Sequence, residues 1–237
     1  MDERNLLRLG GFSAILGAVV ALVANLVHPR ISDFADRVRG ELQMVAASGA
    51  WIPIHLAALA GTLLILFGLY AVVRSLKGGP AEPVARLALG LLLIATPLAI
   101  VLLAVDGYST KSVADAWAGA TGPARDLAFA AATAVADIAW AMFMAFLLTV
   151  LGLAPIALGW AIAASRSYPA ALGWPAAVLG AIAVVAAVLG ILTGPSAAFF
   201  IVFVGASGLL TIWVLALGVV LTRRTAAGAP APTPAAA

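Results

Sequence analysis

Residues 170–192 read AALGWPAAVLGAIAVVAAVLGIL and contain no charged side chain. About 20 apolar residues in an α-helix cross the roughly 30 Å hydrocarbon core of a bilayer, and this stretch is long enough to do so. Comparable apolar stretches occupy 9–27, 49–73, 84–105, 138–164 and 197–221. The sequence therefore predicts an all-α fold, a polytopic transmembrane helix bundle of about six spanning helices, formed as a single domain by residues 1–224.

The overall composition supports this interpretation. Hydrophobic residues make up 64% of the 237 residues and charged residues only 10%, whereas a soluble domain has about 45–50% and about 25%. The chain has no cysteine, which excludes disulfides and thiolate catalysis. Residues 225–237 are rich in alanine and proline, and we expect a disordered cytoplasmic tail there. Arginine outnumbers lysine eleven to two, a bias that favours a bacterial source.

The placement of basic residues predicts the orientation. With the N-terminus inside, the inner segments hold eight lysines and arginines and the outer segments hold five. Cytoplasmic loops of membrane proteins carry the excess of these residues. We therefore expect a multi-pass protein of the bacterial plasma membrane with both termini in the cytoplasm.

The third and fourth spans are bounded less clearly than the others. The third is expected to end at Asp106-Gly107. Residues 127–164 are nearly all apolar and exceed one crossing, but two crossings would place Arg166 outside. We therefore expect one crossing over 138–164, preceded by a separate outer-surface helix that begins near Pro123, since proline is tolerated in a first helical turn.

The outer segment 28–48 has a helical pattern of apolar residues. Apolar residues recur there at steps of three and four and form one stripe along the predicted helix, whereas Asp36, Arg37 and Glu41 lie off it. The residues of the stripe are Ile31, Phe34, Val38, Leu42 and Val45. The pattern predicts an amphipathic helix at the outer interface, with its apolar side in lipid or on the bundle. A surface loop with accidental periodicity is the alternative.

Ionisable residues inside a bilayer are costly, so their positions are the best guide to function. The predicted topology places His28, His55, Asp106 and Asp137 in the outer third, together with Trp51. These four are the candidate catalytic residues, and His28, His55 and Asp137 are candidate ligands of a divalent metal. In the alternative interpretation the histidines are interfacial and bond to backbone or water. No metalloprotease, serine-elbow or nucleotide-loop motif occurs, so no cofactor-binding residue is predicted.

Residues 152–180 carry a resemblance. A predicted helix ends after Gly159-Trp160, and the basic sequence Ser165-Arg166-Ser167 follows. Pro169 then precedes Leu172-Gly173, where the next predicted helix begins. All these residues belong to one predicted cytoplasmic turn and the helix ends beside it. This pattern resembles a family of bacterial six-helix integral membrane proteins of unknown function. The resemblance implies six helices and assigns no catalytic residue.

Three functions remain open at this point. The first is a non-enzymatic binding, accessory or structural role. The second is an intramembrane enzyme, a metal-dependent or acid–base hydrolase with an outward site. The third is a small-solute transporter, which the apolar inner half disfavours because an ion or proton pathway needs polar groups at several depths. Membrane lipid is the expected partner, with a second copy or another membrane protein as further candidates; the basic residues form no face for nucleic acid.

Overall fold

The computed structural model describes residues 3–30 and 36–226. Every element within these ranges is a helix, and six helical stretches are long and apolar enough to cross a membrane. The prediction of an all-α bundle with about six spanning helices is therefore confirmed. The elements in chain order are α1 (Glu3–Val27), α2 (Arg37–Ala47), α3 (Trp51–Ser75), α4 (Glu82–Ala104), η1 (Val105–Ser109), α5 (Thr110–Gly119), α6 (Pro123–Phe146), η2 (Leu147–Leu153), α7 (Ala154–Ala164), α8 (Ala170–Thr193) and α9 (Ala197–Ala226).

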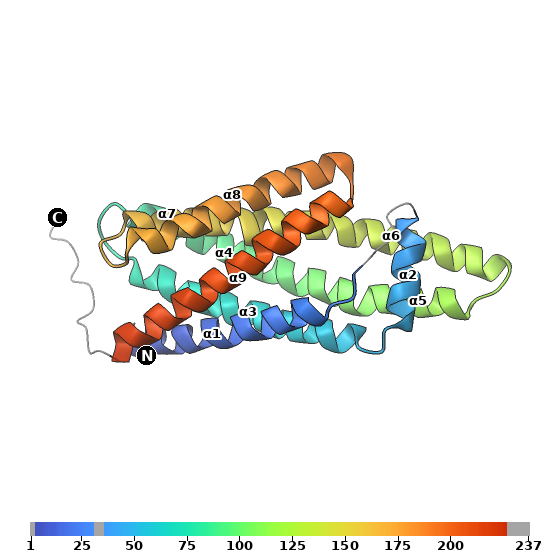
Figure 1. The fold of residues 1–237 in the computed structure, drawn as a ribbon, viewed down its shortest axis with the longest axis horizontal. Coiled ribbons are helices and arrows are strands. Elements are labelled where there is room, and N and C mark those ends of the chain that lie inside the picture. Colours follow the sequence, from blue (N-terminus) through green and yellow to red (C-terminus); the bar gives the residue numbers. More distant parts are fainter. Residues whose placement is uncertain (1–2, 31–35, 227–237) are drawn as a thin grey trace.

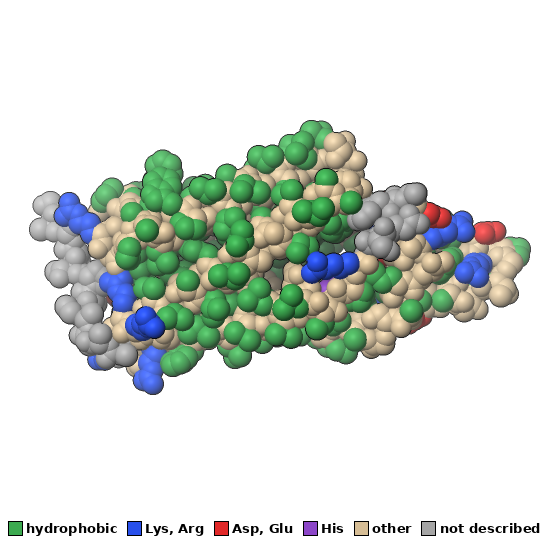
Figure 2. Space-filling model, in the orientation of Figure 1, with side chains coloured by type: hydrophobic (Ala, Val, Ile, Leu, Met, Phe, Trp, Pro, Cys, Tyr) green, Lys and Arg blue, Asp and Glu red, His purple; other side chains and the backbone are tan. Residues whose placement is uncertain are grey.

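The long helices run side by side along one axis (Figure 1). The start of α1 and the end of α9 lie at the same end of the bundle, as an even number of crossings requires. On the face drawn in Figure 2, hydrophobic side chains spread over the middle of the bundle, and lysine and arginine side chains lie mostly toward the two ends, with one basic group beside the histidine. This distribution is what a bilayer requires of a surface that lies in hydrocarbon.

The third helix does not end at Asp106-Gly107, so that expected boundary is wrong. The chain passes through one π-helical turn, η1, and continues as α5 to Gly119. The whole stretch Glu82–Gly119 has 38 residues, about 57 Å of helix. An aspartate-glycine pair usually favours a turn, but here Gly107 is buried against α3.

The fourth span also differs from expectation. Its helix begins at Pro123 as predicted, but α6, η2 and α7 then follow without a break to Ala164, so no separate surface helix ends before Ile138. Asp137 lies inside α6 with its side chain exposed, and its charge interrupts no packing. Pro155 is the second residue of α7, just after the π-helical segment η2, and a missing backbone N–H is tolerated there.

The described part of the outer segment contains the amphipathic helix α2. It begins at Arg37, and Ile31 and Phe34 lie outside the described residues. Leu42 and Val45 are buried, and they contact protein rather than lipid. The apolar stripe of α2 therefore lies on neighbouring helices.

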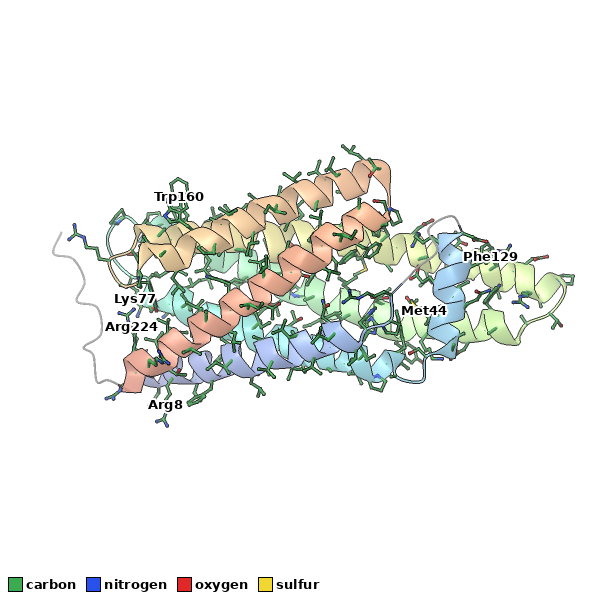
Figure 3. The ribbon with its side chains drawn as sticks, in the orientation of Figure 1. Arg8, Met44, Lys77, Phe129, Trp160 and Arg224 are labelled. Atoms are coloured by element: carbon green, nitrogen blue, oxygen red, sulfur yellow. The ribbon has the colours of Figure 1, made fainter. Side chains whose placement is uncertain are left out.

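We call the assembly of α2, α5 and residues 123–137 of α6 the cap. In Figure 1, α5 and the first half of α6 project past the ends of α8 and α9, and α2 crosses them. Buried side chains from all three helices form its core with Trp51 of α3, and Met44 and Phe129 flank this core (Figure 3). Two arginines stack on cap rings: the guanidinium of Arg39 lies 4.8 Å from the Phe129 ring and that of Arg125 lies 4.4 Å from the Trp117 ring. The buried core residues are Leu42, Val45, Trp51, Ala114, Trp117 and Ala132.

Candidate functional site

His55 lies on α3, one helical turn after Trp51, where the cap meets the bundle. Its Nδ1 is 2.8 Å from the carbonyl oxygen of Trp51, and its Nε2 is 3.1 Å from Oδ2 of Asp106. The side chain is buried, with the residue 3% exposed. Both ring nitrogens are therefore engaged by protein atoms.

These two contacts fix the number of protons in the pair formed by His55 and Asp106. Nδ1 must carry a hydrogen to donate to the carbonyl of Trp51. A hydrogen bond between Nε2 and Oδ2 then needs a second proton, held either by the imidazole or by the carboxyl group. In both arrangements the pair has no net charge, which is the form that costs least in a membrane-embedded site.

The π-helical turn η1 brings Asp106 to this position. Trp51 donates its indole N–H to the backbone carbonyl of Asp106 at 2.8 Å, so side chain and backbone of Asp106 both bind α3. A Cβ added to Gly107 would lie 2.6 Å from the Cβ of His55, so glycine is what allows η1 to approach α3. Single π-helical turns of this kind occur frequently at functional sites.

His28 follows the end of α1 and faces the same cluster. Its ring centroid lies 5.1 Å from the ring of His55 and 5.0 Å from that of Trp51. Nδ1 donates to the carbonyl of Pro29 at 2.6 Å, and among the described residues Nε2 makes no hydrogen bond. Burial, reinforced by the neighbouring His55, lowers the pKa of His28 below its usual 6.5. His28 is therefore neutral at pH 7, with a lone pair on Nε2.

Glu41 on α2 is a further ionisable group at this junction. It forms an ion pair with Arg37 at 3.1 Å, with side chains only 15% and 18% exposed. Burial raises the pKa of Glu41 to about 6. The positive charge of Arg37 lowers this pKa, and the neighbouring Asp106 raises it. The sequence analysis assigned Glu41 to the polar side of α2. The four-residue spacing of Arg37 and Glu41 was the available signal, but it looks the same in an exposed pair.

The structure brings together three of the four candidate residues, His28, His55 and Asp106. Asp137 is exposed on α6 and has no hydrogen bond or ion pair with any described residue. Within residues 3–30 and 36–226, no group of three or more histidine, aspartate or glutamate side chains is placed to hold a metal ion. The proposal of a divalent metal on His28, His55 and Asp137 therefore gains no ligand set here and stays a prediction.

Neither a protein-family model, a curated protein nor a solved structure matches the chain. The resemblance over residues 152–180 therefore stays a prediction; in the structure this stretch forms the end of η2, α7, a short turn and the first half of α8. The cluster of His28, His55 and Asp106 and the neighbouring cap are thus the features that bear on function.

Proposed function

We propose that this chain is a multi-pass protein of a bacterial plasma membrane with a non-enzymatic binding or accessory role. In this proposal the cap binds a partner outside the bilayer. The hydrogen bond between His55 and Asp106 attaches the cap to the spanning helices. Both termini lie in the cytoplasm in this proposal. The observation that carries it is that both ring nitrogens of His55 are bonded within the protein.

This observation matters because chemistry by histidine needs a free nitrogen. A general base or a metal ligand must present a lone pair to the substrate or the ion. His55 is buried and its nitrogens face Trp51 and Asp106. A neutral, fully bonded pair of this kind contributes to specific packing between α3 and η1, which is a structural role.

An outward acid–base enzyme is the second candidate function. It is favoured by the convergence of His28, His55 and Asp106 and by Nε2 of His28, which has no hydrogen bond to the residues that the structure describes. In that reading His28 would be the base and the other two would position it. A transporter has less support, because few polar or charged side chains are buried in the described part of the chain: His55, Ser75, Thr110 and Ser207.

Histidine acylation separates the first two functions. Diethyl pyrocarbonate modifies neutral imidazole nitrogens that carry an accessible lone pair, and the chain has only two histidines. With purified protein in nanodiscs at pH 7, we expect peptide mass spectrometry to find His28 modified and His55 unmodified. The variant Asp106→Ala frees Nε2 of His55 and should raise its modification at least tenfold. Wild-type His55 reacting as fast as His28 would contradict the proposal and support the enzyme.

A further inference from the structure

The end of the bundle opposite the cap carries a surplus of basic side chains. Segments 1–8, 74–86, 165–169 and 222–226 hold eight lysines and arginines and three acidic residues. Of these acidic residues, Asp2 lies outside the described residues, whereas Glu3 pairs with Lys77 at 3.2 Å and Glu82 with Arg86 at 2.5 Å. Among the described residues, the other six basic side chains, all arginines, form no ion pair.

Three of these arginines, Arg8, Arg74 and Arg223, form what we call the arginine triad. Arg8 of α1 is exposed and points away from the bundle (Figure 3), and its guanidinium lies 6.0 Å from the centre of the Phe12 ring, which is also exposed. Arg74 of α3 and Arg223 of α9 are exposed as well, each two helical turns after an exposed apolar side chain. Each member therefore ends a lipid-facing stripe, at the level where hydrocarbon gives way to headgroups.

Close packing of α1 on its two neighbours brings the arginine triad to one depth. Gly10 of α1 lies against Ala71 of α3, and a Cβ added to Gly11 of α1 would lie 2.8 Å from Cγ2 of Thr222 in α9. Each arginine of the triad is at most three residues from these contacts, about 5 Å of helix, and toward the same end. The arginine on α1 is thus flanked on both sides by another arginine at its own depth.

We propose that the arginine triad binds the phosphate of an anionic phospholipid, whose acyl chains lie along the exposed face of α1. Guanidinium groups bind phosphate oxygens through paired hydrogen bonds, and basic sites between spanning helices bind acidic headgroups. The apolar face of α1 continues directly from Arg8, with Phe12, Leu16 and Val19 exposed by 54%, 55% and 45%. Cations without a carboxylate partner among the described residues, beside an apolar face of this length, fit a lipid better than a free phosphate ion.

Native mass spectrometry of the full chain, released from detergent with added lipid, measures this site. With phosphatidylglycerol as the probe, we expect the first lipid adduct to form at a lower concentration than with phosphatidylcholine, whose headgroup has no net charge. Each of Arg8→Gln, Arg74→Gln and Arg223→Gln should weaken the first adduct about fivefold, the effect of one basic residue near anionic lipid. Arg8→Lys keeps the charge and should recover most of the binding, which separates loss of the cation from loss of folding.

Arg166→Gln is the matched control, because it removes an exposed arginine from the turn between α7 and α8 at the same end of the bundle. It should bind phosphatidylglycerol as the wild type does. A loss equal to that of Arg8→Gln would indicate a general attraction to the basic end and would overturn the site. Equal binding of phosphatidylcholine, Arg8→Lys as weak as Arg8→Gln, or displacement of the lipid by millimolar inorganic phosphate would overturn it as well.

Discussion

Gly107 is the single residue on which the contact between η1 and α3 depends most directly. A Cβ there would lie 2.6 Å from the Cβ and 3.1 Å from the Cγ of His55, closer than real side chains approach. We expect Gly107→Ala to push η1 away from α3 and to weaken the hydrogen bonds of Asp106. The free energy of unfolding in mixed micelles should fall by about 1–3 kcal/mol.

Gly90→Ala in α4 is the matched control, because a Cβ at Gly90 meets no atom within 4 Å. That variant should be neutral or more stable by up to about 1 kcal/mol, since alanine favours the helix. An equal decrease in the free energy of unfolding in the two variants would contradict a requirement for glycine where η1 contacts His55.

The sequence predicted the residues of the cluster better than their contacts. His28, His55 and Asp106 were expected at one depth because His28 and Asp106 each follow an apolar stretch and His55 lies near the outer end of another. The bonds of Asp106 to His55 and Trp51 could not be predicted, because they depend on a π-helical turn that no residue pattern specifies. Glu41 was missed for a related reason: burial by neighbouring helices, which the sequence of α2 does not show, raises its pKa.

At the scale of elements, close approach of helices depends on small residues. Gly159 of α7 and Gly173 of α8 each lie against the other's carbonyl oxygen. A Cβ added to Gly159 would lie 2.5 Å from the carbonyl oxygen of Gly173. Lipid supplies no hydrophobic drive between helices, so such packing is a main source of their association. Glycine and alanine recur four residues apart in both helices, as Gly159-Ala163 and Gly173-Ala177, but this spacing does not specify which helices pair.

We expect Gly173→Ala to separate α7 from α8 and to lower stability by about 1–3 kcal/mol. The fluorescence-detected melting temperature of a tagged protein in detergent measures this loss. Gly208→Ala in α9 serves as the control, because a Cβ there meets nothing within 4 Å. A melting temperature of Gly173→Ala as high as that of the control would contradict a tight crossing of α7 and α8.

The number of helices was readable from the sequence, but two of their ends were not. Apolar length gave six spanning stretches, and all six are present. The boundaries expected at Asp106 and before Ile138 failed because a charged residue was taken as the end of a span. Both helices instead continue, with Asp106 bonded to α3 and Asp137 exposed on α6.

At the scale of the molecule, the unequal lengths of the helices define the cap. The stretches Glu82–Gly119 and Pro123–Ala164 have 38 and 42 residues, whereas Ala170–Thr193 has 24. The longest is about 63 Å of helix, roughly twice the thickness of the hydrocarbon core. The excess must project from the bilayer, and all of it lies at the end where α2 packs (Figure 1).

At the end opposite the cap, contacts join α3, the turn between α7 and α8, and α9. Tyr168 bonds Ser75 at 2.7 Å, and Arg224 stacks on the Tyr168 ring at 4.6 Å and donates to the carbonyl of Ser167. Arg8, Lys77 and Arg224 all lie at this end (Figure 3). This basic end is the one that we propose to face the cytoplasm.

Labelling of introduced cysteines tests the central claim most directly, because the chain has no cysteine of its own. Gln43 on α2 and Arg166 between α7 and α8 are both exposed and lie at opposite ends of the bundle. In intact cells, a membrane-impermeant maleimide should label Gln43→Cys at once and Arg166→Cys only after the membrane is opened. Labelling of Arg166→Cys from outside, with Gln43→Cys protected, would contradict an outward cap.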